Sequence, residues 1–151
     1  ESWQRQAGTL RGRTVLLAED EPELRDILGL MLEGFEMKVI RASNGNEACR
    51  LQEDFIGEID FLLTDVVMPE MDGVALAEIF ARRRPHTNVI YMSGYPLAPA
   101  DGPCGPRLPD TACFIGKPLQ EDTVRQVLER ALARRALREG LARGADEDSD
   151  Q

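Results

Sequence analysis

Five polar or charged side chains of this 151-residue chain come at the ends of short apolar runs or close to them: Glu19, Asp20, Asp65, Ser93 and Lys117. Runs of this kind are typical of strands that are buried on both faces of a parallel sheet. Ligands of an open parallel sheet bind outside the carboxyl ends of its strands, so we expect the five side chains to meet at one edge. The arrangement carries the prediction, because any one of these residues alone would indicate little.

Three carboxylates and one ammonium at a single edge indicate phosphoryl-transfer chemistry. Carboxylates that converge repel one another and are costly to bury unless a cation joins them. Oxygen ligands with no histidine or cysteine nearby suit Mg²⁺. Together with Lys117, one of only two lysines in the chain, such an ion would surround a carboxylate oxygen with positive charge. Asp65 would then be the nucleophile that forms an aspartyl phosphate, and the hydroxyl of Ser93 would bind a phosphoryl oxygen.

The elements that must position these side chains alternate between strands and helices. Strands are predicted from apolar runs at residues 14–18, 39–40, 61–64, 89–92 and 112–115. Helices are predicted from apolar residues at helical spacing at residues 22–34, 47–53, 73–84 and 124–132. Pro22 suits the first turn of a helix, and Asp72 suits a helix N-cap. The alternation predicts an α/β fold with a parallel sheet covered by helices on both sides.

The alternation breaks between Gly94 and Asp110, where five prolines and two further glycines crowd together. A proline in the interior of a helix costs about 3 kcal/mol. We therefore expect a long loop here, so that the helix after the fourth strand is missing or irregular.

Length and composition bound the organisation of the chain. With 42% hydrophobic and 30% charged residues, it is expected to form one globular domain over residues 13–138. Residues 1–12 are interpreted as a linker or cloning remnant, and residues 139–151 as an acidic flexible tail. The formal net charge of −9 argues against a nucleic-acid-binding face, which would be basic.

The cysteine and histidine content excludes several kinds of site. The three cysteines are scattered and form no CxxC pair, which favours a reducing, cytoplasmic setting over a disulfide framework. His86 is the only histidine, so a multi-histidine metal site within the chain is excluded. No run approaches the ~20 apolar residues of a membrane span, and we expect no membrane contact by this domain.

Four motifs carry a resemblance to a known family. They are, in order, VLLAEDE at 15–21, LTDVVMPEMDG at 63–73, VIYMSGY at 89–95 and FIGKP at 114–118. Over about residues 13–135 the chain resembles the receiver domain of bacterial two-component response regulators, and it is most similar to the receivers of hybrid sensor histidine kinases. The resemblance implies a flavodoxin-like, doubly wound sheet of five parallel strands in the order 2-1-3-4-5.

The resemblance also assigns chemistry to single residues. It implies a phosphorelay in which Asp65 is phosphorylated by a histidine kinase or a histidine phosphotransfer domain and slowly dephosphorylates itself. The metal site, for Mg²⁺, would include Asp65. Asp20 and the backbone carbonyl of Val67 would bind the ion directly, and Glu19 would act largely through water.

Signalling residues follow from the same resemblance. Ser93 would be the switch hydroxyl, Phe114 the switch aromatic residue and Lys117 the lysine that senses the phosphoryl group. The Lys117–Pro118 peptide bond is expected to be cis, as in related receivers. A homodimer is possible, although the proline-rich segment replaces a helix that usually helps to form the family's signalling face.

Ordinary structural roles are the alternatives at these positions. Asp20 could cap the helix that begins at Pro22, and Glu19 could simply point to solvent. Ser93 could satisfy a turn, and Phe114 could belong to the core.

Two other functions compete with the phosphoacceptor. The alternative is a receiver-like module that binds a partner without phosphorylation, and the complete set of Asp20, Asp65, Ser93 and Lys117 weighs against it. A phosphatase with an aspartate nucleophile would need a second acid two residues later, where this chain has Val67. We therefore expect no turnover enzyme in this domain by itself, although it could be part of a hybrid histidine kinase.

Overall fold

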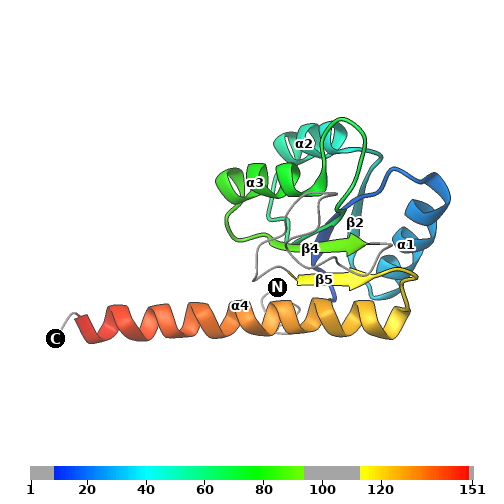
Figure 1. Ribbon diagram of the computed structural model, residues 1–151. Helices are drawn as coiled ribbons and strands as arrows, with labels where there is room; N and C mark the ends of the chain where they lie inside the picture. Colours follow the sequence, from blue (N-terminus) through cyan, green and yellow to red (C-terminus); the bar gives the residue numbers. More distant parts are fainter. Residues whose placement is uncertain (1–8, 94–112, 150–151) are drawn as a thin grey trace, which may run out of the picture.

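The computed structural model of the protein describes residues 9–93 and 113–149, and five parallel strands form one sheet at its centre (Figure 1). The strands are β1 (Thr14–Ala18), β2 (Lys38–Ala42), β3 (Phe61–Asp65), β4 (Asn88–Ser93) and β5 (Cys113–Gly116). They lie in the order β2-β1-β3-β4-β5, and every neighbouring pair is parallel. The predicted flavodoxin-like fold and its strand order are confirmed.

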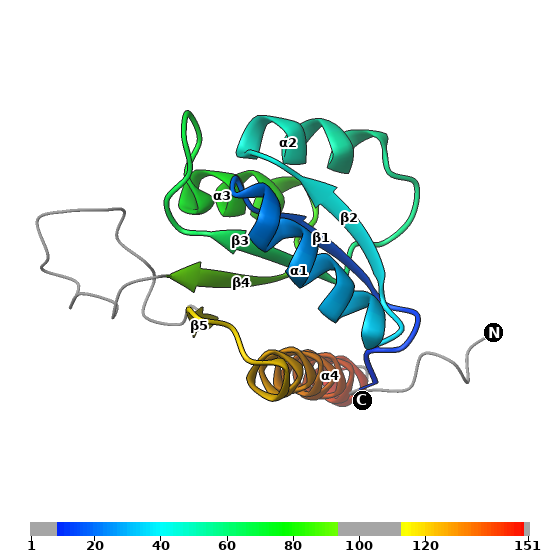
Figure 2. The ribbon, with the colours of Figure 1, turned by 90° about the vertical axis from the view of Figure 1, so that its right-hand side faces the viewer.

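Helices cover both faces of the sheet: α1 (Pro22–Gly34), α2 (Gly45–Asp54), α3 (Gly73–Arg83) and α4 (Glu121–Ser149). On one face, Leu28 of α1 and Leu128 of α4 share a core with Leu63 of β3. On the other face, Phe80 of α3 packs with Leu62 of β3. Figure 2 shows α2 and α3 on one side of the sheet and α4 on the other. Because β1 and β3 are covered from both sides, every residue of these two strands is buried, as their apolar runs predicted.

The edge strand β2 is longer than its short apolar run indicated. It pairs residue by residue with β1, from Lys38 opposite Thr14 to Ala42 opposite Ala18. Its side chains are mostly exposed or half-buried. The apolar run at residues 39–40 therefore predicted the middle of this strand but not its ends, Lys38 and Ala42.

The helix caps agree with the sequence in one case and correct it in another. Asp72 accepts a hydrogen bond from the backbone N–H of Ala75 at 2.8 Å, so it is the N-cap of α3, as predicted. Helix α1 begins at Pro22, but Glu21 occupies the N-cap position and no side chain caps the helix. The alternative of Asp20 as this cap is therefore wrong.

Helix α4 corrects the expectation of a flexible tail over residues 139–151. The helix continues to Ser149 and extends well past the end of the sheet (Figure 1). Residues 133–145 are mostly alanine, leucine, arginine and glutamate, which are strong helix formers. The acidic residues at the end of the chain indicated a solvated segment, but they do not determine its backbone conformation. The helix propensity of the residues before them does.

A second buried aspartate lies at the amino end of β3, just before its first residue. Asp60 is 2% exposed, and its carboxylate accepts a hydrogen bond from the backbone N–H of Thr14 at 2.9 Å. Arg13 and Arg135 place guanidinium nitrogens 3.4 and 4.0 Å from its other oxygen. These contacts tie β1, β3 and α4 together at the edge of the sheet opposite the predicted site.

The predicted loop over residues 94–110 lies outside the described residues. Among the residues that the structure does describe, no helix is both long and apolar enough to cross a membrane.

Candidate functional site

The strand register brings the predicted side chains to the carboxyl edge of the sheet. Asp65 is the last residue of β3 and pairs with Met92 of β4. Ser93 ends β4, and its carbonyl accepts a hydrogen bond from the backbone N–H of Lys117 at 2.7 Å. Glu19 follows β1, which lies directly beside β3. Four strand ends therefore deliver these groups to one place.

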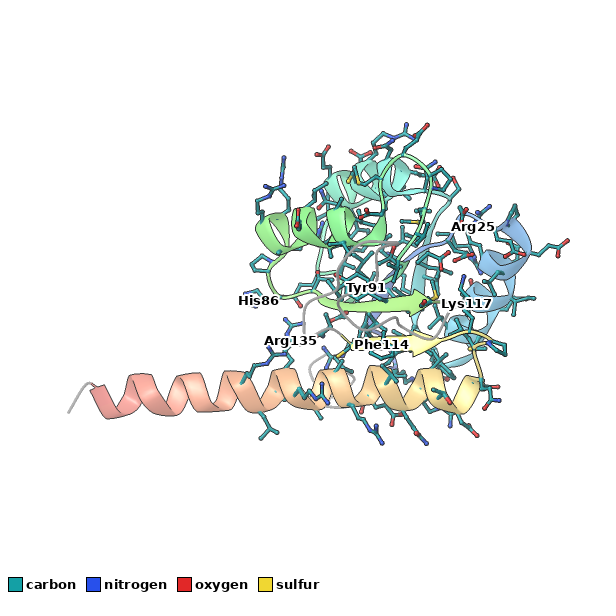
Figure 3. All side chains as sticks on the ribbon, viewed as in Figure 1. Arg25, His86, Tyr91, Phe114, Lys117 and Arg135 are labelled. Carbon is teal, nitrogen blue, oxygen red and sulfur yellow. The ribbon has the colours of Figure 1, made fainter. Side chains whose placement is uncertain are left out.

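Lys117 joins two of the carboxylates from the end of β5. Its Nζ lies 2.7 Å from Oδ1 of Asp65 and 3.5 Å from Oε2 of Glu19. Figure 3 shows its side chain at the end of the sheet toward which β4 and β5 point. Partial burial lowers the pKa of Lys117, but the hydrogen bond to Asp65 and the charge of Glu19 outweigh this effect, and the pKa is raised. The ammonium is therefore held in its charged form beside Asp65.

Glu19, Asp20 and Asp65 form an acidic cluster in which each offers an oxygen within 4.8 Å of the others. Asp20 is exposed, whereas Glu19 and Asp65 are only 1% and 6% exposed. The alternative in which Glu19 points to solvent is therefore wrong. Its Oε2 is buried and makes no hydrogen bond within the described residues, since the ammonium of Lys117 lies at ion-pair distance only.

The buried carboxylate of Glu19 is held in an unfavourable environment. Burial, the ability of a protonated Glu19 to donate to Asp65, and the negative charge of Asp65 raise the pKa of Glu19 to about 8, although Lys117 opposes this shift. One ammonium thus does not compensate three carboxylates. A buried oxygen without a partner, in a cluster of hard oxygen donors, fits a divalent cation such as Mg²⁺.

The chain after Asp65 is fixed by a close contact between β3 and α3. The backbone N–H of Val66 donates to the carbonyl of Met92, and the N–H of Gly73 donates to the carbonyl of Val66. A Cβ at Gly73 would overlap the carbonyl oxygen of Asp65. Only glycine therefore lets α3 begin directly against the end of β3.

Three further predicted residues lie near this edge. The side chain of Val67 is 70% exposed, and within the described residues its carbonyl accepts no backbone hydrogen bond. Ser93 is half-buried at the end of β4. Phe114 of β5 is 50% exposed, so the alternative of a core residue does not hold. The Lys117–Pro118 peptide bond is cis, as expected.

Sequence reasoning missed Arg25, which contacts the same site from the first turns of α1. Its Nη1 donates a hydrogen bond to the backbone carbonyl of Glu19 at 2.9 Å. No motif points to this residue, because an arginine early in a helix is ordinary and its target is a main-chain atom.

Comparison with known proteins identifies the family. Residues 15–102 match the family described as the response regulator receiver domain. The chain belongs to this family.

The sensor kinase CckA of Brucella abortus is 36% identical over 125 residues, which are 78% of this chain and 13% of that protein. The response regulator receiver protein CpdR of the same organism is 38% identical over 84 residues, covering 55% of this chain and 68% of CpdR. The chain therefore spans a small part of CckA and about two thirds of CpdR.

Solved structures of receiver domains share the fold. The receiver domain of the hybrid histidine kinase CckA is 28% identical, with a TM-score of 0.65 over 79% of this chain and 98% of that one. The receiver domain of the sensor histidine kinase PA1611 from Pseudomonas aeruginosa PAO1 has a TM-score of 0.68 over 80% of this chain and 98% of that one. It is 21% identical and is described with a magnesium ion in its active site cleft. The second likeness supports the fold of this chain.

Proposed function

We propose that this chain is a phosphoacceptor receiver of a two-component phosphorelay, which is phosphorylated on Asp65 by a histidine kinase or a histidine phosphotransfer domain. The observation that carries the proposal is the ammonium of Lys117, 2.7 Å from Asp65, beside a buried carboxylate oxygen that lacks a hydrogen-bond partner. This arrangement supplies a nucleophile, the fixed positive charge of Lys117, and a place where a metal cation could add a second positive charge. Membership in the receiver family supports the same reading.

The transfer itself needs little covalent chemistry from the protein. An oxygen of the Asp65 carboxylate attacks the phosphorus of a phosphohistidine, and an O–P bond forms while the N–P bond breaks. The electron pair of the broken bond returns to the imidazole nitrogen of the donor, which takes up a proton from solvent. Lys117 holds the attacking carboxylate in place and balances negative charge on the phosphoryl oxygens.

The residues of the cluster suit Mg²⁺, as the resemblance to receivers implied. Asp20, Asp65 and the backbone carbonyl of Val67 would bind the ion, and Glu19 would act largely through water. A divalent cation bound there would neutralise the crowded carboxylates and the charge on the transferring phosphoryl group. The buried Oε2 of Glu19 without a hydrogen-bond partner and the raised pKa of this carboxyl support the assignment, because a bound cation would stabilise its charged form.

Signalling by conformational change is the further part of the proposal. Ser93 would bind the phosphoryl group as the switch hydroxyl. Phe114 would respond as the switch aromatic residue, and its exposed ring leaves room for such a movement. The similarity to CckA supports a place in a hybrid kinase, and the scattered cysteines support a cytoplasmic setting.

Acetyl phosphate separates this function from a module that acts without phosphorylation. Intact-protein mass spectrometry after incubation with acetyl phosphate and Mg²⁺ should show the gain of one phosphoryl group. Asp65→Asn should abolish the gain, whereas Asp26→Asn, the same change at an exposed position of α1, should leave it intact. An unlabelled wild-type protein, or labelling that survives Asp65→Asn, would contradict the proposal.

A further inference from the structure

The loop between β1 and α1, residues 19–21, carries two carboxylates of the acidic cluster. Its first residue is held by β2, because the backbone N–H of Glu19 donates to the carbonyl of Ala42 at 3.1 Å. Its far end lacks the usual support, since no side chain caps α1 and Pro22 has no N–H to offer. The position of Asp20 in this loop therefore depends on other contacts.

Arg25 supplies contacts to both ends of this loop. Its backbone N–H donates to the carbonyl of Glu21, and its guanidinium Nη1 donates to the carbonyl of Glu19, each at 2.9 Å. Figure 3 shows Arg25 on α1 at the same end of the sheet as Lys117. Within the described residues, no other side chain bonds to the main chain of this loop.

The bonded carbonyl belongs to the peptide group that joins Glu19 to Asp20. Fixing this peptide sets the directions of both side chains, so that Glu19 turns inward and Asp20 outward. Both carboxylates keep an oxygen within 4.8 Å of Asp65 in this orientation. A loose peptide would let Asp20 leave the cluster, because its side chain is exposed.

We propose that Arg25 is a positioning residue, which holds the Glu19–Asp20 peptide so that Asp20 is presented to the cation. This inference rests on the proposed function, and it states that Arg25 strengthens the binding of Mg²⁺ at the site. The guanidinium of Arg25 bonds to the main-chain carbonyl of Glu19, and Asp65 is held by Lys117 instead. Substitution of Arg25 should therefore weaken Mg²⁺ binding and leave the maximal rate of phosphorylation largely unchanged.

The positive charge of Arg25, taken alone, would weaken the binding of Mg²⁺, whereas its positioning role strengthens it. A guanidinium near the cluster repels Mg²⁺, so its removal would tighten binding if charge dominated. Arg25→Ala removes both the charge and the hydrogen bond, whereas Arg25→Lys keeps the charge and loses the planar guanidinium group with its fixed N–H directions. Weaker binding in both variants separates positioning from electrostatics.

Isothermal titration calorimetry with Mg²⁺ tests the inference directly. We expect Arg25→Ala to raise the Kd about tenfold, as for other residues that orient metal ligands, and Arg25→Lys to raise it severalfold. The rate of labelling by acetyl phosphate at saturating Mg²⁺ should stay within about twofold of wild type. Arg50→Ala, an exposed arginine on α2, is the matched control and should change neither value.

The outcomes separate this inference from the proposed function. An unchanged or lower Kd in the Arg25 variants would overturn the positioning role, while labelling of wild type on Asp65 would still support the phosphoacceptor. A wild type that binds Mg²⁺ without labelling would overturn the proposed function and leave the Kd comparison valid. Should Arg25→Ala fail to fold, the Kd of Arg25→Lys decides. Wild type that binds no Mg²⁺ would contradict both.

Discussion

Strand β3 has a buried aspartate at each end, and the two ends of this strand differ in how their charge is balanced. At the amino end, Asp60 faces two guanidinium groups and a backbone N–H. At the carboxyl end, Asp65 shares one ammonium with Glu19, and a buried oxygen of Glu19 has no hydrogen-bond partner in the described part of the chain. The charges are balanced within the protein at the amino edge, which is the edge of the sheet at Asp60, and they are not balanced at the carboxyl edge, which is the edge at Asp65.

This difference separates a structural carboxylate from a reactive one. A buried charge is tolerated when its hydrogen bonds and counter-charges come from the protein itself, as at Asp60. A cluster that lacks them is costly, and this cost is consistent with a site that is completed by a cation from solution. Burial alone would not have distinguished the two aspartates, because both are almost fully buried.

The largest expected effect is on labelling, through the lysine of the carboxyl edge. Lys117→Gln removes the ammonium beside Asp65, so labelling by acetyl phosphate should slow by about 100-fold or more. Lys38→Gln changes the other lysine, which contacts the ring of Phe55, and should leave the rate within about twofold. Equal rates in the two variants would remove Lys117 from the mechanism.

A substitution at the amino edge should instead lower the stability of the fold and leave labelling unaffected. Asp60→Asn removes the buried negative charge that faces two guanidinium groups, and we expect it to lower the free energy of unfolding by about 2–4 kcal/mol. Urea denaturation measures this loss. The affinity for Mg²⁺ should match wild type, and a large change in that affinity would break the proposed separation between the edges.

Glu19 should make the stability of the metal-free protein depend on pH. Folding raises its pKa from the usual 4.5 to about 8, so the folded state binds more protons between these values. The contribution of Glu19 to stability is therefore fully present below about pH 4.5 and is lost as the pH rises through 8. We expect wild type to lose about 3 kcal/mol of stability relative to Glu19→Gln between pH 5 and pH 8. A constant difference between the two proteins over this range would show that Glu19 stays charged.

The smallest expected effect comes from one arginine of the amino edge. Arg13→Gln leaves Asp60 with the N–H of Thr14 and with Arg135, so the free energy of unfolding should fall by about 1 kcal/mol. Thermal unfolding measures this loss, which should be clearly smaller than that of Asp60→Asn. A loss as large as that of Asp60→Asn would show that Arg13 alone balances the aspartate.

The sequence predicted the sheet and the carboxyl edge because both leave local signals. Buried parallel strands are continuous apolar runs, and the first charged residue that follows each run marks its carboxyl end, as Asp65 does at the end of β3. The order of the strands and the roles of single residues came from the resemblance to receivers. The end of α4 was mispredicted because acidic composition was weighed above helix propensity.

Contacts that join distant segments left no such signal. Asp60 lies 47 residues from Arg13, and the charge pattern of the chain does not pair them. Arg84 likewise follows α3, yet its guanidinium donates to the carbonyls of Gln52 and Phe55 at the end of α2, at 2.7 and 2.9 Å. Arg25 bonds to a main-chain carbonyl, which any residue could offer. These roles depend on the folded arrangement and could not be predicted from residue types.

The effect of Mg²⁺ on the melting temperature tests the central claim most directly, namely that the carboxyl edge is completed by a cation from solution. Mg²⁺ binds the folded state, so the melting temperature of wild type and of Asp60→Asn should rise as the ion is added. Asp20→Ala should lose most of that rise. An equal rise in Asp20→Ala, or no rise in wild type, would contradict the account.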